Sequence, residues 1–154
     1  MESNSQSKII LIKATHADIE KYISIESKVA SKTYATLLDE KSVLGEMAKG
    51  PVYMVKRGED TVGTVSYEIK EDGSVYLSGL AVDPEYQGQG IGRDAIEKVL
   101  SEVSDAPKVW LVTHPENAKA VSLYESLGFK ITDKKDNYFG DGEPRIVLTL
   151  VKSK

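Results

Sequence analysis

Alternating apolar and polar positions run through most of this chain and predict a protein rich in strands. A period of two is typical of a strand with one buried face, and short runs of β-branched and apolar residues also indicate strands. Seven segments fit one of these descriptions: residues 8–13, 52–57, 61–70, 75–82, 109–113, 129–134 and 145–151. Turns at Gly58-Glu59-Asp60 and at Asp72-Gly73 join the second, third and fourth segments, which predicts antiparallel hairpins.

Apolar residues at helical spacing predict four helices between these strands. Residues 15–18 resemble a capping box in front of the first helix, and a second, short helix is expected after Asp39. The third helix follows a glycine-rich loop at 88–92. The fourth is expected to start near residues 115–116 and to end at Gly128, which is suited to a helix C-terminus.

The order of these elements predicts an α/β fold of the α+β type, with a mixed sheet of about seven strands flanked by four helices. A strand-helix-strand connection favours parallel neighbours, so 109–113 is expected to lie parallel to 75–82. The 154 residues suit a single domain, 1–154, in which residues 1–7 form a flexible N-terminal tail.

The loop before the third helix holds three glycines in five positions, at 88, 90 and 92. Glycine costs about 0.5 to 1 kcal/mol relative to alanine in regular structure, so we expect something to approach this backbone closely. N–H groups at a helix N-terminus bind phosphate, which favours a phosphate cradle; the alternative is a tight turn without a ligand. The spacing differs from GxGxxG, since Arg93 stands where the last glycine would be, and it lacks the lysine and hydroxyl of a P-loop.

Two motifs in this order resemble the GNAT superfamily of acetyl-CoA-dependent N-acetyltransferases. The first is Q-x-x-G-x-G at 87–92, and the second is the asparagine at 117 followed by a helix that ends in LYESLGF. A strand at 109–113 lies between them, and the resemblance covers nearly the whole chain. LYESLGF and the tyrosine-rich C-terminal segment are most similar in type to ribosomal-protein and protein N-terminal acetyltransferases.

The resemblance implies a site for acetyl-CoA as co-substrate. In the family, amides of the glycine loop hold the CoA pyrophosphate, and the preceding strand bonds the pantetheine arm as a neighbouring strand would. The residues that match are Leu80, Ala81, Val82, Gln87, Gly88, Gln89, Gly90, Ile91, Gly92, Arg93, Asn117 and Tyr124. Asn117 can instead serve only as the N-cap of its helix. Gly79 marks either a bulge, where a backbone N–H polarises the thioester carbonyl, or a packing gap.

Tyr124 and Glu68 are the expected catalytic residues. The resemblance implies that Tyr124 donates a proton to the departing CoA thiolate; the alternative is an aromatic residue in a core stripe. The general base is open, because the glutamate of ribosomal-protein alanine acetyltransferases falls at Val112 here. Glu68, which hairpin counting places opposite Leu77, is one substitute, and an exposed glutamate near a turn is its structural alternative. His114 has a pKa suited to a base but can also merely start a helix, and a water chain is a third solution.

The acceptor is expected to contact Tyr34, between the first two helices, and Tyr138, in the connection 137–144. That connection resembles the peptide-lining segment of protein N-terminal acetyltransferases, although a hairpin loop of that length needs no substrate. The expected reaction is direct attack of a primary amine on acetyl-CoA in a ternary complex, with a peptide or protein N-terminus as acceptor. A small amine, such as a polyamine or amino compound, and a non-catalytic acyl-CoA-binding regulatory module are the alternatives.

Composition bears on partners and location. The net charge is −4 and no lysine and arginine cluster exists, which argues against nucleic acid and anionic membrane as partners. With no cysteine and two histidines, neither a disulfide nor a metal is expected. The apolar run at 9–12 is too short for a signal segment or membrane span, which predicts a cytoplasmic protein. A homodimer is compatible with the sequence.

Overall fold

A computed structural model of the protein describes residues 8–29 and 39–151. The strands in these ranges form a seven-stranded sheet in the order β1-β2-β3-β4-β5-β7-β6. They are β1 (Ile10–Lys13), β2 (Val52–Arg57), β3 (Asp60–Ile69), β4 (Val75–Val82), β5 (Lys108–Thr113), β6 (Lys130–Lys135) and β7 (Arg145–Val151). Neighbouring strands are antiparallel except for β4 and β5, which are parallel. The predicted mixed sheet with its parallel pair is confirmed.

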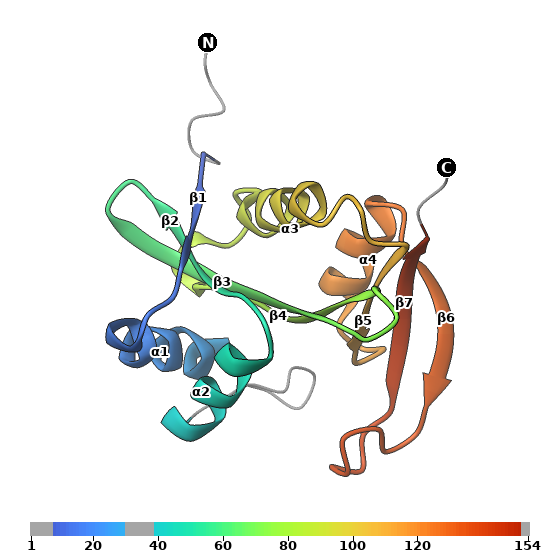
Figure 1. The fold of residues 1–154 in the computed structure, drawn as a ribbon. Helices are drawn as coiled ribbons and strands as arrows, with labels where there is room; N and C mark the ends of the chain where they lie inside the picture. Colours follow the sequence, from blue (N-terminus) through green and yellow to red (C-terminus); the bar gives the residue numbers. More distant parts are fainter. Residues whose placement is uncertain (1–7, 30–38, 152–154) are drawn as a thin grey trace.

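Four α-helices in the described ranges cover the sheet, two on each face (Figure 1). They are α1 (Ile19–Val29), α2 (Glu40–Lys49), α3 (Ile91–Glu102) and α4 (Ala118–Ser126). The capping box at 15–18 forms as predicted and leads through one 3-10 turn into α1. Asp39 caps α2 by accepting the Ser42 N–H at 2.8 Å. The fourth helix begins at Ala118, later than predicted, because Asn117 occupies the capping position.

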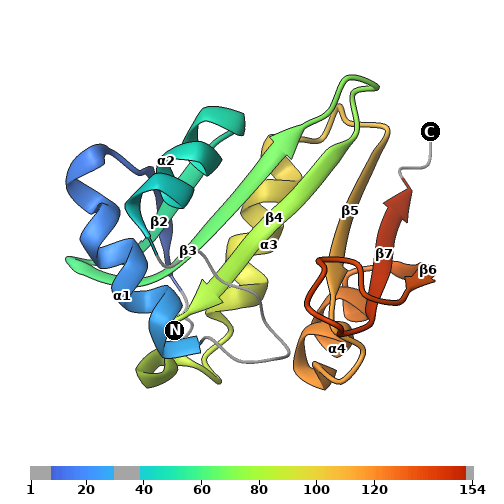
Figure 2. The same ribbon diagram turned by 90° about the horizontal axis from the view of Figure 1, so that it is seen from below.

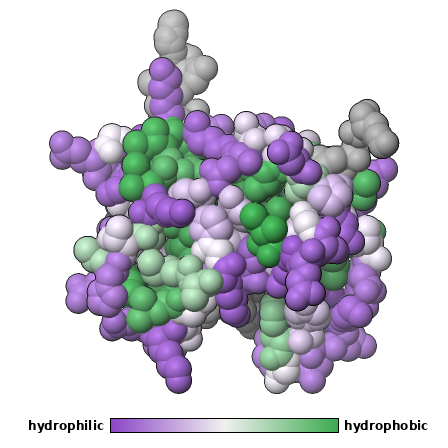
Figure 3. All heavy atoms as spheres, in the orientation of Figure 1, coloured by the Kyte–Doolittle hydropathy of each residue, from purple (hydrophilic) through white to green (hydrophobic). Residues whose placement is uncertain are grey.

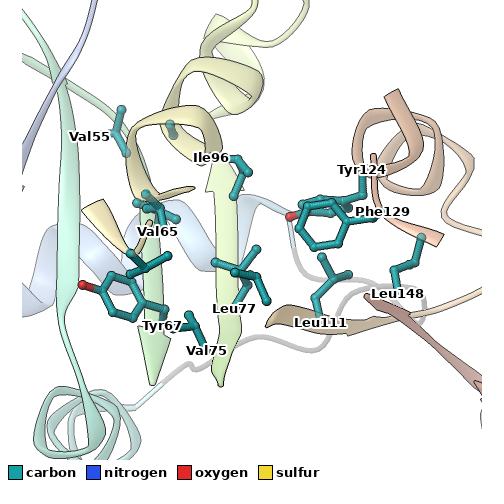
Figure 4. Close-up of a cluster of buried hydrophobic side chains, with 14 of the residues drawn as sticks. Val55, Val65, Tyr67, Val75, Leu77, Ile96, Leu111, Tyr124, Phe129 and Leu148 are labelled. Atoms are coloured by element: carbon teal, nitrogen blue, oxygen red, sulfur yellow. The ribbon is translucent and has the colours of Figure 1, made fainter. Parts of the chain in front are cut away.

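The sheet face under α3 and α4 carries the main hydrophobic core. Val65 of β3 and Val75 and Leu77 of β4 are buried there, together with Ile96 of α3. Figure 4 shows these side chains directed toward one another, with the Tyr124 and Phe129 rings beside them on the α4 side. Because side chains alternate along a strand, the intervening residues of β3 and β4 face α1 and α2.

The opposite sheet face, toward α1 and α2, is polar at its centre. We call this the polar face; its members are Thr64, Ser66 and Glu68 of β3 and Ser78 of β4. The three β3 side chains are buried. Thr64 donates a hydrogen bond to Glu26 of α1, at 3.2 Å. A separate apolar cluster holds the two helices to β2; it comprises Ile19, Tyr22, Val43, Val52 and Met54.

A β-bulge interrupts the pairing of β3 with β4. Ser66 pairs with Gly79 and Tyr67 pairs with Leu77, so Ser78 is an extra residue of β4. The bulge expected near Gly79 is thus found directly before it. On the turn side of the bulge, Glu68 pairs with Tyr76. The prediction from hairpin counting that Glu68 lies opposite Leu77 was wrong, because Lys70 bonds Ser74 and the turn therefore holds three residues, 71–73, and not two.

The parallel strands β4 and β5 pair over a short distance and then separate. Both lie wholly within the described residues, and their pairing consists of Val75 with Val109 and Tyr76 with Trp110. Figure 2 shows the two strands close at one end and diverging toward the other. The later residues of β4 therefore pair with β3 on one edge and face an opening on the other.

The surface in Figure 3 is mostly hydrophilic, and its hydrophobic areas are separate patches. Two of the exposed large apolar side chains, Ile10 and Ile12, belong to the edge strand β1. Within residues 8–29 and 39–151, no helix has the length and apolar character needed to cross a bilayer.

Candidate active site

The opening between β4 and β5 is a cavity of about 630 Å³. This volume is in the range of pockets that bind small molecules and cofactors, roughly 300 to 1,000 Å³. Its walls come from β4, β5, the glycine loop, α4 and the β6–β7 connection. Most of the predicted CoA-binding residues line it: Leu80, Ala81, Val82, Gln87, Gly88, Gly90, Ile91, Gly92, Arg93, Asn117 and Tyr124.

The glycine loop presents open backbone at the start of α3. Gly88 and Gly90 both have φ of +81°, a left-handed conformation that favours glycine, and Gly90 is the capping residue of the helix. Nothing lies within 4 Å of a Cβ built on Gly88. The Gln87 side chain donates to the Val82 carbonyl at 2.9 Å and so ties the loop to the end of β4. Free N–H groups at the N-terminus of this three-turn helix fit a pyrophosphate.

Gln89 is the one predicted CoA-binding residue that does not line the cavity. Its side-chain oxygen instead accepts a hydrogen bond from Arg57 Nη1 at 2.6 Å. The Arg57 guanidinium also lies 5.1 Å from the centre of the Tyr86 ring. Gln89 therefore connects the loop to β2, and this pairing with a distant strand could not be derived from the motif.

The backbone edge of β4 that faces the cavity is suited to an extended ligand with amide groups. From Gly79 to Val82 the strand is paired with β3, which leaves its other edge without a strand partner in β5. A ligand lying along this edge can form the hydrogen bonds that a neighbouring strand would form. The bulge at Ser78 turns the backbone at the point where β4 and β5 separate.

Tyr124 is buried in the cavity wall. Its side chain is 6% exposed, and its ring meets that of Phe129 edge-on with 5.4 Å between centroids. In Figure 4 its hydroxyl end points away from α4 and toward β4. Burial raises the pKa of Tyr124 above its usual value, so the phenol stays protonated and can act as a proton donor.

Asn117 combines the two roles that the sequence left open. Its Oδ1 accepts the Ala120 N–H at 3.3 Å, which makes it the N-cap of α4. It also lines the cavity. The cap occupies only the oxygen of the side chain, so the amide NH₂ group is available to a ligand.

His114 lines the cavity but uses both ring nitrogens within the protein. Nδ1 accepts the Glu116 N–H at 3.0 Å, and Nε2 lies 2.7 Å from Glu143 Oε1. The first bond requires an unprotonated Nδ1, so the proton is on Nε2 and is donated to Glu143. The side chain is 1% exposed. Through these two contacts His114 links the β6–β7 connection to the start of α4.

The Glu68 side chain lies on the polar face of the sheet and does not line the cavity. Its side chain is buried, and its Oε1 is 2.8 Å from Lys70 Nζ. The Lys70 ammonium in turn lies 5.4 Å from the centre of the Tyr76 ring, which does line the cavity. Val112, where the family glutamate was expected, also lines the cavity and brings no acidic group.

Two further residues line the cavity: Phe139, in the connection 137–144, and Arg145, the first residue of β7, which the sequence did not single out. Arg145 is 2% exposed, donates to Asp141 and to the Pro144 carbonyl, and lies 5.0 Å from the Phe139 ring centre. Tyr138 packs edge-on against Phe139 but is 39% exposed and does not line the cavity. A charged residue opening an otherwise apolar strand was the available signal for Arg145. Tyr34 lies outside the described residues.

Groups of three or more acidic or histidine side chains that could hold a metal ion do not occur within residues 8–29 and 39–151. The groups that the described cavity offers include the Tyr124 phenol, the Asn117 amide and the Ser78 hydroxyl.

Comparison with known proteins gives consistent matches. The sequence family described as the Acetyltransferase (GNAT) family matches residues 19–129. The ribosomal protein bS18-alanine N-acetyltransferase of Escherichia coli (strain K12) is 40% identical over 79 residues, which are 48% of this chain and 53% of that protein. The chain thus spans about half the length of that relative.

Two further matches extend over more of the chain. The bS18-alanine N-acetyltransferase of Salmonella typhimurium (strain LT2) is 27% identical over 128 residues, covering 80% of this chain and 86% of the relative. The crystal structure of the ribosomal-protein-S18-alanine N-acetyltransferase from Escherichia coli superposes with a TM-score of 0.81 at 25% identity and covers 96% of each chain.

Proposed function

Because the chain belongs to the GNAT acetyltransferase family, we propose that it transfers the acetyl group of acetyl-CoA to a primary amine by direct attack in a ternary complex. The family resemblance predicted from two short motifs is confirmed by a match over residues 19–129. The observation that carries the proposed activity is the opening between β4 and β5, which has the glycine loop and Tyr124 in its walls.

The residues of this site fit acetyl-CoA, which supplies an activated acetyl thioester. The amides of the loop at 87–93 would hold the pyrophosphate, and the free edge of Leu80, Ala81 and Val82 would bond the pantetheine amides. The Asn117 NH₂ group would donate to the same ligand. Tyr124, kept protonated by burial, would give its proton to the CoA sulfur as it departs.

For the acceptor we propose a peptide or protein N-terminus. The names of the bS18-alanine N-acetyltransferases describe N-terminal acceptors of this kind in similar proteins. In this chain Phe139 of the β6–β7 connection and the buried Arg145 at the start of β7 border the cavity, and His114 holds the connection in place through Glu143. These contacts give the acceptor side of the cavity a defined wall.

The chemistry of the amine agrees with this choice. At pH 7, removing the proton from an α-amino group with a pKa near 8 costs about 1.4 kcal/mol, whereas a lysine-like amine with a pKa near 10.4 costs about 4.6 kcal/mol. A site without a carboxylate at Val112 is better matched to the amine that needs less help.

The proposal is tested by following free CoA thiol with a thiol-reactive dye, because a chain without cysteine contributes no background. The acceptors are a short peptide with a free N-terminal alanine and an internal lysine, the same peptide with its N-terminus blocked, and a polyamine. Release with the free peptide alone is the expected result. Release with the polyamine alone would assign a small-amine acceptor, and saturable acetyl-CoA binding without any release would assign the regulatory module.

A further inference from the structure

The polar face of the sheet reaches the cavity at a single side chain, Ser78. Ser78 is the extra residue at the β-bulge, and it lines the cavity. Its Oγ lies 2.9 Å from Ser66 Oγ, so the two hydroxyls share a hydrogen bond across β3 and β4. A hydroxyl that both accepts and donates can pass a proton between the cavity and a group on the polar face.

On the far side of Ser78 lies a carboxylate that the fold does not explain. Glu46 of α2 is half-buried, and Ser78 and Glu68 lie near enough to its carboxyl group to affect its pKa. Its Oε2 is buried without a hydrogen-bond partner among the described residues. Buried polar atoms in folded proteins are nearly always paired, so an unpaired carboxylate oxygen calls for a functional explanation.

The surroundings of Glu46 make it a stronger base than an exposed glutamate. Burial raises the pKa of Glu46, and the charge of Glu68 raises it further, while Ser78 and Lys49 act in the opposite direction. Two groups on neighbouring elements also feel its charge, namely Tyr22 of α1 and Tyr76 of β4, and Lys70 does so beyond the end of β3. A carboxyl group with a pKa moved toward neutrality is suited to accept and release a proton near pH 7.

We propose that Glu46 accepts the proton of the acceptor amine through the hydroxyl of Ser78, in place of a strand glutamate. This inference rests on the proposed acetyltransferase function. The other candidates on the cavity wall are occupied or absent: both ring nitrogens of His114 are engaged, and Val112 has no ionisable group. Glu68 has an indirect role, because its negative charge raises the pKa of Glu46. Lys70 forms an ion pair with Glu68.

The proton balance of the step is complete. The ammonium gives one proton to Ser78 Oγ as the Ser78 proton moves to Glu46, and the free amine then forms the N–C bond to the acetyl carbonyl. The C–S bond breaks, the sulfur takes the Tyr124 proton, and the second amine proton restores Tyr124. Glu46 finally releases its proton to solvent, so that one proton is liberated for each amide formed.

Glu46→Gln tests the relay, since it keeps the size of the side chain and removes the base. We expect kcat/KM for the free-N-terminus peptide to fall about tenfold at pH 7, because only about a tenth of an amine with a pKa near 8 is then already deprotonated. The loss should shrink as the pH rises above about 8, where the acceptor amine is already deprotonated. The affinity for acetyl-CoA should be unchanged, and the thermal midpoint should be equal or higher, because a buried charge is removed.

Two further variants complete the test. Glu40→Gln, on the exposed start of the same helix, is the matched control and should leave kcat/KM unchanged. Ser78→Ala should reproduce the pH-dependent loss, and the double variant with Glu46→Gln should lose little more than either single variant, because the two side chains act in one path.

Three results would overturn the relay. They are full activity of Glu46→Gln at pH 7, a loss that is equal at every pH, and losses from Glu46→Gln and Ser78→Ala that simply multiply. If the unsubstituted protein released no CoA with any amine, the proposed function itself would fail first. Measuring it alongside every variant separates the two failures.

Discussion

The two faces of β3 and β4 are equally buried but chemically opposite. Val65 and Ser66 are neighbours in the chain and are 1% and 2% exposed, yet they point to different sides of the sheet. On the α3 and α4 side the strands carry valine, leucine and tyrosine in one continuous core. On the α1 and α2 side they carry hydroxyl and carboxyl groups beside Glu26 and Glu46.

The comparison shows that the two faces of one pair of strands can have different roles. Burying apolar area stabilises the fold by roughly 25 cal/mol per Å², whereas a buried polar group costs free energy unless it is hydrogen-bonded. The members of the polar face are paired, so the uncompensated cost among the described residues falls on the unpaired Glu46 Oε2 beside them, which points to a function at that position. Substitutions on the two faces should consequently differ in kind, and four measurements examine this.

The largest effect is expected at Tyr124 of α4, which is part of the apolar core and is also the expected proton donor. Tyr124→Phe keeps the ring and its edge contact with Phe129 but removes the proton donor. We expect kcat to fall about 100- to 10,000-fold, with the acetyl-CoA affinity and the thermal midpoint nearly unchanged. Steady-state release of CoA and a thermal melt measure both properties. Full activity of this variant would show that Tyr124 serves only in packing and that the apolar side takes no part in the chemistry.

The adjacent pair Val65 and Ser66 tests the comparison directly. Val65→Ala removes buried methyl groups from the core and should lower the free energy of unfolding by about 2 to 3 kcal/mol, without changing kcat of the folded protein. Ser66→Ala removes one hydrogen bond and should cost only about 1 kcal/mol, but kcat/KM should fall because Ser78 loses its partner. Urea titrations and CoA release on both variants provide the values. The reverse pattern would contradict the division of tasks.

Substitutions at two glycines can distinguish a role of the backbone in ligand binding from a role in backbone conformation. Gly88 and Gly58 both have positive φ, and nothing lies within 4 Å of a Cβ on either. Alanine at each should destabilise the protein by a similar amount, roughly 1 to 2 kcal/mol. Only Gly88→Ala should weaken acetyl-CoA binding, by about tenfold or 1.4 kcal/mol, since Gly88 lines the cavity and Gly58 lies in the β2–β3 turn. Calorimetric titration of both variants with acetyl-CoA tests this.

The smallest effect concerns the ion pair between Lys28 of α1 and Asp83, which precedes the glycine loop. Burial alone would raise the pKa of Asp83, but the Glu85 N–H and the Lys28 ammonium, 3.0 Å away, lower it below its ordinary value. A lowered pKa in the folded state stabilises the protein above the unfolded pKa of about 3.9, and this contribution is lost as the pH falls through the folded value. Asp83→Asn should cost about 1 kcal/mol at pH 7 and converge with the unsubstituted protein in acid. Urea midpoints from pH 7 down to pH 3 would show this convergence, and a constant difference would exclude it.

The features predicted correctly from the sequence are those that arise locally. The strands, the helix starts at 15–18 and Asp39, and the glycine loop each depend on a few consecutive residues, so patterns of spacing identify them. The strand-helix-strand connection then indicated the parallel pair, whereas the position of β7 between β5 and β6 was not predicted. The seven-stranded sheet and the family could therefore be predicted from the sequence alone.

The features that sequence reasoning missed depend on contacts between distant segments. Counting residues along the hairpin placed Glu68 opposite Leu77, because Asp72-Gly73 indicates a two-residue turn whereas the turn holds residues 71–73. His114 has a histidine's ordinary chemistry until Glu116 and Glu143 occupy its two nitrogens. Glu46 looked like one more polar position on a surface helix.

The bulge at Ser78 also determines which side chains of β4 point into the core. Before it, Val75 and Leu77 point into the core, and after it Leu80 and Val82 do so, which strict alternation would not allow. Deleting Ser78 would keep Leu80 and Val82 in the core but remove the bulge, whereas one inserted, regularly paired residue would turn them toward the polar face and their neighbours into the core. Insertions and deletions in this stretch should therefore be selected against during evolution, whereas the exposed β6–β7 connection can change length at less cost to the fold.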